Sequence, residues 1–136
     1  MNYSNLSPQL STIAEKAIQI GLDTISTEKN KLYSFLVYGE QGSQLQRFVI
    51  DSDEEALNTA LEFISQMDDL SSAAVYAYKD SITMNDGIFD AITIQIYGID
   101  EEHGYSFSQV YRLSDKSLEL LNEKLFMGKI KNALVF

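Results

Sequence analysis

Apolar residues recur every three or four positions in three parts of the chain, and this spacing places them on one face of an α-helix. In the first part, Ser7 is a candidate N-cap and Pro8 suits the first helical position. In the second part, Ser52 and Glu55 have the spacing of a capping box. The third part opens on a serine and closes on a glycine, which favour helix ends. The predicted helices span 7–27, 51–67 and 114–128.

Other segments alternate apolar and polar residues, or are rich in tyrosine, isoleucine and valine, as β-strands are. In one of them, Ile92, Ile94 and Ile96 share a face and are expected to point into the core. Asp86 and Gly87, just before it, favour a tight hairpin turn. The predicted strands span 31–39, 45–50, 71–79, 88–99, 105–113 and, at the end of the chain, 129–136.

The order of these elements is α-β-β-α-β-β-β-α-(β), and the connections between neighbouring strands are short. Short connections imply an antiparallel sheet. The pattern therefore predicts an α+β fold, in which an antiparallel sheet of about five strands is packed on one face by two or three helices. No linker or repeat interrupts the sequence, so we expect a single domain over residues 1–136.

The composition is that of a folded domain, with 45% hydrophobic residues and one proline. The absence of cysteine excludes disulfides, thiolate nucleophiles and zinc–sulfur sites. The first residues lack the basic and apolar regions of a signal peptide, and no apolar run is long enough to span a membrane. We therefore expect a cytoplasmic protein.

The formal net charge of −10 is the strongest global feature of the sequence. A field of this sign repels phosphate backbones and anionic lipid surfaces, so we expect neither nucleic-acid nor membrane binding. A negative surface serves solubility, and it also steers a protein toward a basic partner. The expected partner is therefore a protein with a basic surface, or a second copy of the chain.

Two acid-rich stretches, 51–55 and 80–90, offer oxygen atoms to a cation, but neither has the ligand spacing of a calcium-binding EF-hand loop. The first of them fits a helix N-terminus instead. The seven glycines form no phosphate-binding pattern. We therefore expect no metal ion and no cofactor.

His103 is the only histidine, and it follows three acids in the sequence DEEHG. Histidine is a common general base and metal ligand. A base needs a nucleophile or a substrate within hydrogen-bond reach, and no nucleophile motif accompanies this one. A loop histidine among solvated acids is therefore the favoured interpretation, and a small hydrolase that uses His103 is an alternative.

Asp90 falls on the same strand face as the core isoleucines, where a carboxylate needs solvent or a partner. Arg47 and Arg112 are the expected partners, because both lie in predicted strands and a guanidinium binds a carboxylate with two hydrogen bonds. The three residues form either an ion pair at the edge of the sheet or a polar functional pocket.

Tyrosines are concentrated in the predicted strands, and tyrosine is enriched at protein interfaces. If Tyr97, Tyr105 and Tyr111 share a face with Phe107, they form an apolar patch ringed by acids; otherwise helices cover them. The candidate binding residues are thus Asp90, Arg47, Arg112, Tyr97, Tyr105, Phe107, Tyr111 and His103.

A small acidic α+β domain without catalytic motifs is similar in composition to bacterial immunity proteins, although no motif carries that similarity and no residue role follows from it. The favoured function is non-covalent binding of a basic protein, as an inhibitor, immunity factor or adaptor would bind. The alternatives are an oligomerisation or structural module, in which tyrosine-bearing strands pair across a two-fold axis, and the hydrolase.

Overall fold

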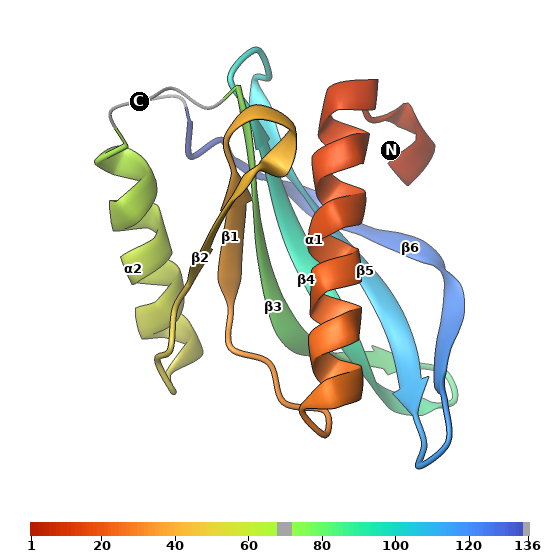
Figure 1. Cartoon of the computed structure of the whole chain (residues 1–136). Helices are drawn as coiled ribbons and strands as arrows, with labels where there is room; N and C mark the ends of the chain where they lie inside the picture. Colours follow the sequence, from red (N-terminus) through yellow and green to blue (C-terminus); the bar gives the residue numbers. More distant parts are fainter. Residues whose placement is uncertain (68–71, 135–136) are drawn as a thin grey trace.

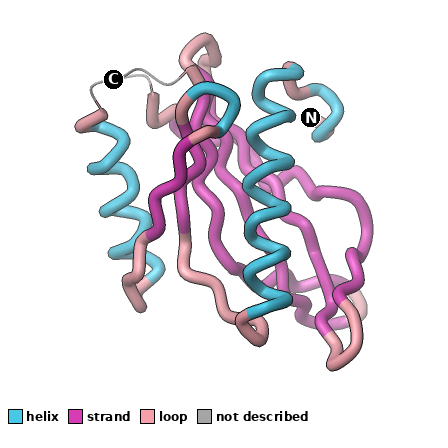
Figure 2. The backbone as a smooth tube through the Cα atoms, in the orientation of Figure 1, coloured by secondary structure: helices cyan, strands magenta, loops and turns pink. Residues whose placement is uncertain are grey.

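The computed structural model describes residues 1–67 and 72–134, and it contains six strands, two α-helices and two short 3₁₀ helices. All strand pairs are antiparallel and form one sheet in the order β2-β1-β3-β4-β5-β6 (Figures 1 and 2). The elements are η1 (Tyr3–Asn5), α1 (Pro8–Thr27), β1 (Phe35–Tyr38), η2 (Glu40–Gly42), β2 (Gln44–Arg47), α2 (Asp53–Ser65), β3 (Ala73–Met84), β4 (Gly87–Gly98), β5 (His103–Leu113) and β6 (Leu118–Lys131). The predicted α+β fold with an antiparallel sheet is confirmed, with six strands in place of about five.

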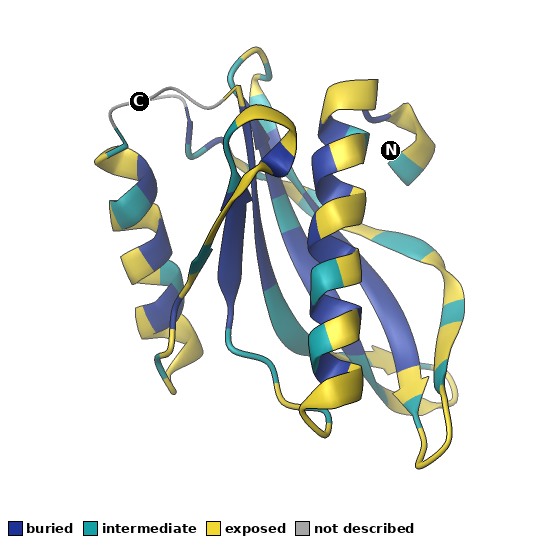
Figure 3. Cartoon of the chain, viewed as in Figure 1, coloured by how far each residue is buried: buried dark blue, intermediate teal, exposed yellow. Residues whose placement is uncertain are grey.

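The first helix, α1, begins where the sequence predicts, because the Ser7 hydroxyl accepts a hydrogen bond from the Leu10 amide at 3.3 Å. Its buried stripe contains two alanines and Gly21, and these small residues let the helix approach the sheet closely. A Cβ at Gly21 would lie 2.8 Å from Cδ1 of Ile92. The outward face of α1 is exposed, and its inward face is buried (Figure 3).

The second helix, α2, begins at the predicted cap, where the Ser52 hydroxyl accepts a hydrogen bond from the Glu55 amide at 3.3 Å. It does not lie beside α1. Phe35 and Val37 of β1 pack in the same cluster as α1, whereas Leu36 between them packs with α2. Since successive strand residues point to opposite faces, the two helices cover opposite faces of the sheet instead of a single face.

The central hairpin of the sheet follows the prediction closely. β3 pairs with β4 along twelve positions, and the two-residue connection Asn85–Asp86 closes the predicted turn. Ile92, Ile94 and Ile96 are fully buried on the α1 side, as their alternation indicates. Ser71, the first residue of the predicted strand 71–79, lies outside the described residues.

The helix predicted over 114–128 is wrong, because Leu118–Lys131 forms the edge strand β6. Two irregularities interrupt its pairing with β5. Val110 lies opposite Leu121 and Ser108 opposite Leu125, so three residues of β6 face the single residue Gln109. These extra residues replace the strand period of two with apolar spacings of three and four, which resemble a helix.

The predicted last strand, 129–136, is partly correct. Residues 129–131 belong to β6, and Asn132, Ala133 and Leu134 follow it outside the strand. Residues 135–136 lie outside the described part of the chain. The Asn132 amide group donates hydrogen bonds of 2.7 Å to the carbonyl oxygens of Gly98 and Glu101, which holds the end of the chain against the β4–β5 connection.

Candidate functional site

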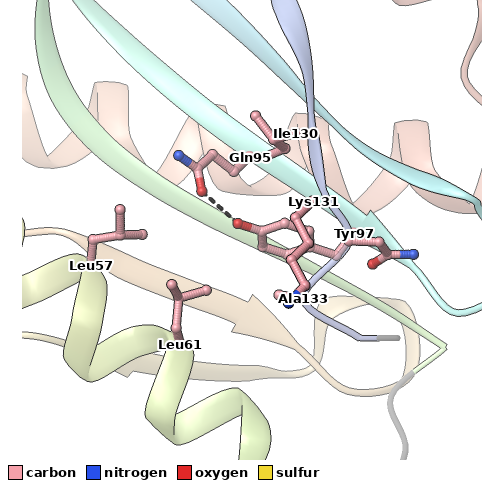
Figure 4. A pocket seen from close by; sticks show the side chains of 8 residues that line it. Leu57, Leu61, Gln95, Tyr97, Ile130, Lys131 and Ala133 are labelled. Atoms are coloured by element: carbon pink, nitrogen blue, oxygen red, sulfur yellow. Dashed lines mark hydrogen bonds between the residues drawn. The ribbon is translucent and has the colours of Figure 1, made fainter. Parts of the chain in front are cut away.

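Two adjoining cavities lie between α2 and the face of the sheet that α2 covers, and we call them together the α2 groove. The first has a volume of about 370 Å³, the second about 280 Å³, and Leu57 and Gln95 line both. Figure 4 shows the first cavity, in which Leu57 and Leu61 of α2 lie across from Gln95 and Tyr97 of β4. Its remaining lining residues are Ile130, Lys131, Asn132 and Ala133. Its exposed lining is mostly apolar, which suits a hydrophobic side chain.

The second cavity carries the acidic end of the α2 groove. Asp53 and Glu54 line it together with Tyr76 and Tyr78, whose ring centroids are 5.8 Å apart and whose planes make an angle of 33°. The two carboxylates stand in the first helical turn, where the helix dipole stabilises negative charge. Asp53 and Glu54 thus begin α2 and at the same time place two exposed carboxylates beside Tyr76 and Tyr78.

The tyrosines of the α2 groove remain protonated well above neutral pH. Burial raises the pKa of Tyr76, Tyr78 and Tyr97 above the ordinary tyrosine value. The negative charge of Asp53 adds to this rise for Tyr76, and that of Asp80 adds to it for Tyr78. The Tyr97 hydroxyl donates a hydrogen bond to Oε1 of Gln95 (Figure 4). The wall of the groove is therefore neutral, and only its rim is charged.

Beyond the tyrosines, the same face of the sheet continues as a row of small polar residues. Thr93 lies between Tyr78 of β3 and Ser108 of β5 in the register. Its hydroxyl donates to Oδ2 of Asp80 at 2.8 Å and is 2.6 Å from the Ser108 hydroxyl. Thr93 and Ser108 are buried, and this hydrogen-bonded row satisfies their hydroxyl groups.

Two further clefts touch α2. One lies between α2 and the end of β2 and includes Arg47, Phe48 and Glu62. The other lies at the N-terminal end of α2, where Asp53 and Tyr78 line it together with Lys31 and Lys79. Asp53 thus lines both this cleft and the acidic cavity of the α2 groove.

Asp90 has different partners from those predicted. The Asn30 side-chain amide donates to its Oδ2 at 3.0 Å, and Lys79 Nζ lies 4.0 Å from its Oδ1. The Tyr111 hydroxyl donates to Oδ1 of Asn30 at 2.7 Å. Asn30 lies in the turn that follows α1 and has a left-handed backbone, with φ of 67°. This turn places the Asn30 side chain within hydrogen-bond reach of Asp90 on β4 and Tyr111 on β5. This cluster anchors the end of α1 to the sheet.

Neither arginine reaches Asp90, so the predicted grouping of the three residues is wrong. Arg47 stands on β2, which β1 and β3 separate from β4. Arg112 follows Tyr111 and therefore points to the other face, where it lies 5.9 Å from the ring centroid of Phe89 and 3.9 Å from Glu119 Oε2. The order of the strands in the sheet decides which residues of different strands meet. Spacing along the sequence does not indicate that order, so the partners of Asp90 could not be predicted from it.

The four aromatic residues do not share one face, so the conditional patch does not form, and the alternative that helices cover these rings fits Phe107, Tyr111 and Tyr97. Phe107 and Tyr111 are buried in the α1 cluster with Tyr105 packed against them, whereas Tyr97 belongs to the α2 cluster. Burial raises the pKa of Tyr111, and nearby Asp90 adds to the rise. Of the predicted aromatic residues, Tyr97 is the one that lines the α2 groove.

His103 begins β5 and is partly exposed, with its Nε2 atom 3.9 Å from Oε1 of Glu102. It pairs in the sheet with Lys131. Within residues 1–67 and 72–134, no group of three or more histidine, aspartate and glutamate side chains is placed to hold a metal ion. The role of His103 stays a prediction.

Sequence reasoning missed most of the α2 groove, namely Leu57, Leu61, Tyr76, Tyr78 and Gln95. The alternation along β4 does place Gln95 and Tyr97 opposite the core isoleucines. The apolar stripe of α2 was also broad, and Leu61 at its border is 38% exposed in the structure. The broad apolar stripe of α2 and the tyrosine-rich strand face were both visible in the sequence. They indicate a binding groove only once it is known that α2 covers that face of the sheet.

A scan against protein-family models, a search of curated proteins and a search of solved structures each found no match to this chain. Among the described helices, none is long and apolar enough to cross a membrane.

Proposed function

We propose that this protein is a non-catalytic binding module that engages a basic protein in the cytoplasm, as an inhibitor, immunity-type factor or adaptor does. The observation that carries this proposal is the position of the acidic residues. Throughout the described residues, every aspartate and glutamate side chain is exposed or half-buried. Among them, Glu15, Asp90 and Glu119 are the ones with a lysine or arginine nitrogen within 4.0 Å. Most of the negative charge is therefore available to a partner.

The densest part of this charge lies at the start of α2. Asp51, Asp53, Glu54 and Glu55 are all exposed within five residues, and none has a lysine or arginine nitrogen within 4.0 Å among the described residues. Lys31 attracts Asp51 from a greater distance. The carboxylates repel one another, and a basic partner that binds here relieves this repulsion and adds ionic attraction. The electrostatic contribution to binding is expected to fall as salt rises, since exposed charges are screened over about 8 Å at physiological ionic strength.

A four-residue charge-neutral variant tests the proposal. The substitutions are Asp51→Asn, Asp53→Asn, Glu54→Gln and Glu55→Gln, with Ser52 kept as the helix cap. The matched control removes the same charge elsewhere, through Asp23→Asn, Glu28→Gln, Glu40→Gln and Asp115→Asn. Circular dichroism verifies the helix content of both proteins.

The measurement is the capture of cellular proteins at low and moderate salt, with identification of each retained protein. The proposal predicts a basic protein that the wild type and the control retain at low salt, and that the 51–55 variant loses. The purified partner must bind the wild type and the control with similar affinity and the 51–55 variant more weakly. If no protein is retained at low salt, or if both variants bind it equally, the proposal is wrong.

A self-association module is a second candidate, because β6 is an edge strand of 14 residues and, among the described strands, only β5 pairs with it. Leu120, Phe126 and Met127 on this strand are exposed, with 51%, 36% and 47% of their surface accessible. Light scattering at high protein concentration decides between a monomer and a dimer. A dimer that Phe126→Glu disperses supports self-association through β6, and a monomer removes this candidate.

A further inference from the structure

We infer that the α2 groove is the recognition site for a peptide segment that pairs an arginine or lysine side chain with an adjacent large apolar side chain. The cation would enter the cavity lined by Asp53, Glu54, Tyr76 and Tyr78, and the apolar side chain would enter the cavity of Leu57, Leu61 and Tyr97. This inference rests on the proposed function and gives it a place and a recognition chemistry.

The lining of the acidic cavity suits a cation. A cation that enters meets two exposed carboxylates, which have no competing lysine or arginine within 4.0 Å among the described residues. Tyr76 and Tyr78 line the same cavity, and aromatic rings attract a nearby cation. Charged rim and aromatic wall favour the same kind of ligand.

The helix dipole works against a cation here, because the N-terminus of α2 carries a partial positive charge of about half a unit. The first turn contains Asp53, Glu54 and Glu55, and Asp51 precedes it. Their summed charge is several times larger than the partial charge of the dipole and has the opposite sign. The local potential at the cavity mouth is therefore negative, and the cation remains favoured.

The two cavities adjoin each other at Leu57 and Gln95, which line both. A ligand with two neighbouring side chains can therefore place one side chain in each cavity. The Gln95 side-chain oxygen at this junction accepts a hydrogen bond from Tyr97, and its NH₂ group carries two donors that can reach a peptide carbonyl. Lys131 lines the far cavity and disfavours a second cation there, which fixes the direction of the ligand.

Three blocked dipeptides test this recognition chemistry by ¹H–¹⁵N NMR titration of the full chain. The first is N-acetyl-Phe-Arg-amide. The second replaces arginine with the neutral isostere citrulline, and the third replaces phenylalanine with glycine. The inference predicts saturable shifts of the amides of α2 and of Gln95 with the first peptide. Each replacement weakens binding by about tenfold, through loss of ionic and cation–π contacts or of apolar burial.

Variants of the groove provide the second arm of the test. Asp53→Asn with Glu54→Gln keeps the side-chain shapes and is expected to weaken the binding of N-acetyl-Phe-Arg-amide by about tenfold. This loss should match the loss that the citrulline peptide shows with the wild type. Leu61→Glu alters an exposed position and blocks the apolar cavity, so it also weakens binding. Glu40→Gln with Asp115→Asn removes the same charge at distant exposed positions and leaves binding unchanged.

The outcomes separate this inference from the proposed function. Absence of saturable shifts at millimolar N-acetyl-Phe-Arg-amide overturns the inference, and so do shifts confined to β6 or α1. Equal binding of the citrulline peptide overturns the cation site. If the groove fails in this way while a basic protein still depends on residues 51–55 in the capture experiment, the proposed function stands and the partner uses the acidic rim alone.

Discussion

The helices α1 and α2 cover opposite faces of one sheet, and they do so with different residues. α1 presents Ala14, Ala17 and Gly21 to the isoleucine row of β4, so its backbone approaches the sheet closely. α2 also buries two alanines, Ala56 and Ala60, and it packs in one cluster with Tyr76 and Tyr97 of the sheet. However, α2 buries only three of its residues, whereas α1 buries eight. The looser contact of α2 with the sheet leaves the cavities of the α2 groove beside it.

The difference suggests a division of roles between the faces. The α1 side supplies the larger buried cluster and therefore most of the hydrophobic stabilisation. The α2 side carries open space, exposed acids and neutral tyrosines, the features of a binding surface. Two sets of substitutions and a change of pH test this division, followed by one measurement on the native chain.

Truncation of a phenylalanine on each face is expected to have the largest effect. Phe107 is fully buried, with ring centroids 5.3 Å from both Tyr3 and Phe126, and Phe107→Ala is expected to destabilise the protein by about 3–5 kcal/mol. Phe63 on α2 is only partly buried, and Phe63→Ala is expected to cost no more than about 2 kcal/mol. Urea unfolding measures both values, and equal costs would contradict the division.

Alkaline pH is expected to have the next largest effect. Burial raises the pKa of both Tyr97 and Tyr111, so the unfolded chain releases these protons first as pH rises above about 10. Stability contributed by each tyrosine is present below that pH and is lost above it, by up to about 1.4 kcal/mol per pH unit. Urea midpoints at several alkaline pH values measure the slope.

The same experiment compares the two faces directly. Tyr97→Phe and Tyr111→Phe should each reduce the slope of stability against pH. If Tyr97→Phe leaves the slope unchanged while Tyr111→Phe reduces it, water reaches Tyr97 through the α2 groove in the folded protein, and the groove opens more than this structure shows.

Much of this fold could be predicted from the sequence, because local signals and tertiary packing agree in most elements. Ser7 and Ser52 cap the helices as predicted, and the isoleucines of β4 are buried as predicted. β6 was missed because leucine, glutamate and lysine favour a helix, while pairing with β5 decides the structure. Local propensity is a weak signal where an unpaired sheet edge is available.

The candidate site was harder to predict, since it depends on which elements meet. Asp90 was recognised as a residue that needs a partner, and it has one in Asn30, which is 60 positions away in the sequence. The α2 groove arises between a helix and strands whose faces are assigned only by the three-dimensional order. No sequence period indicates that α2 covers Tyr97 and not Ile96.

Removal of the Asn30 contacts is expected to have the smallest effect of the three. Tyr111→Phe deprives Oδ1 of Asn30 of its donor and should cost about 1 kcal/mol. Asn30→Gly retains the left-handed backbone and loses the contacts to Asp90 and Tyr111, whereas Asn30→Ala adds strain of about 1 kcal/mol. Urea unfolding measures the three variants. Equal stability of the alanine and glycine variants would contradict the role of the turn.

Hydrogen exchange of backbone amides tests the central claim most directly, because it reports the opening of each helix separately. In the free protein, the account predicts that amides in the buried part of α1 exchange only through global unfolding, while those of α2 exchange through a smaller opening. Addition of N-acetyl-Phe-Arg-amide should protect α2 and leave α1 unchanged. Equal protection of the two helices in the free protein, or added protection confined to α1, would contradict the claim that the α2 face is the binding face.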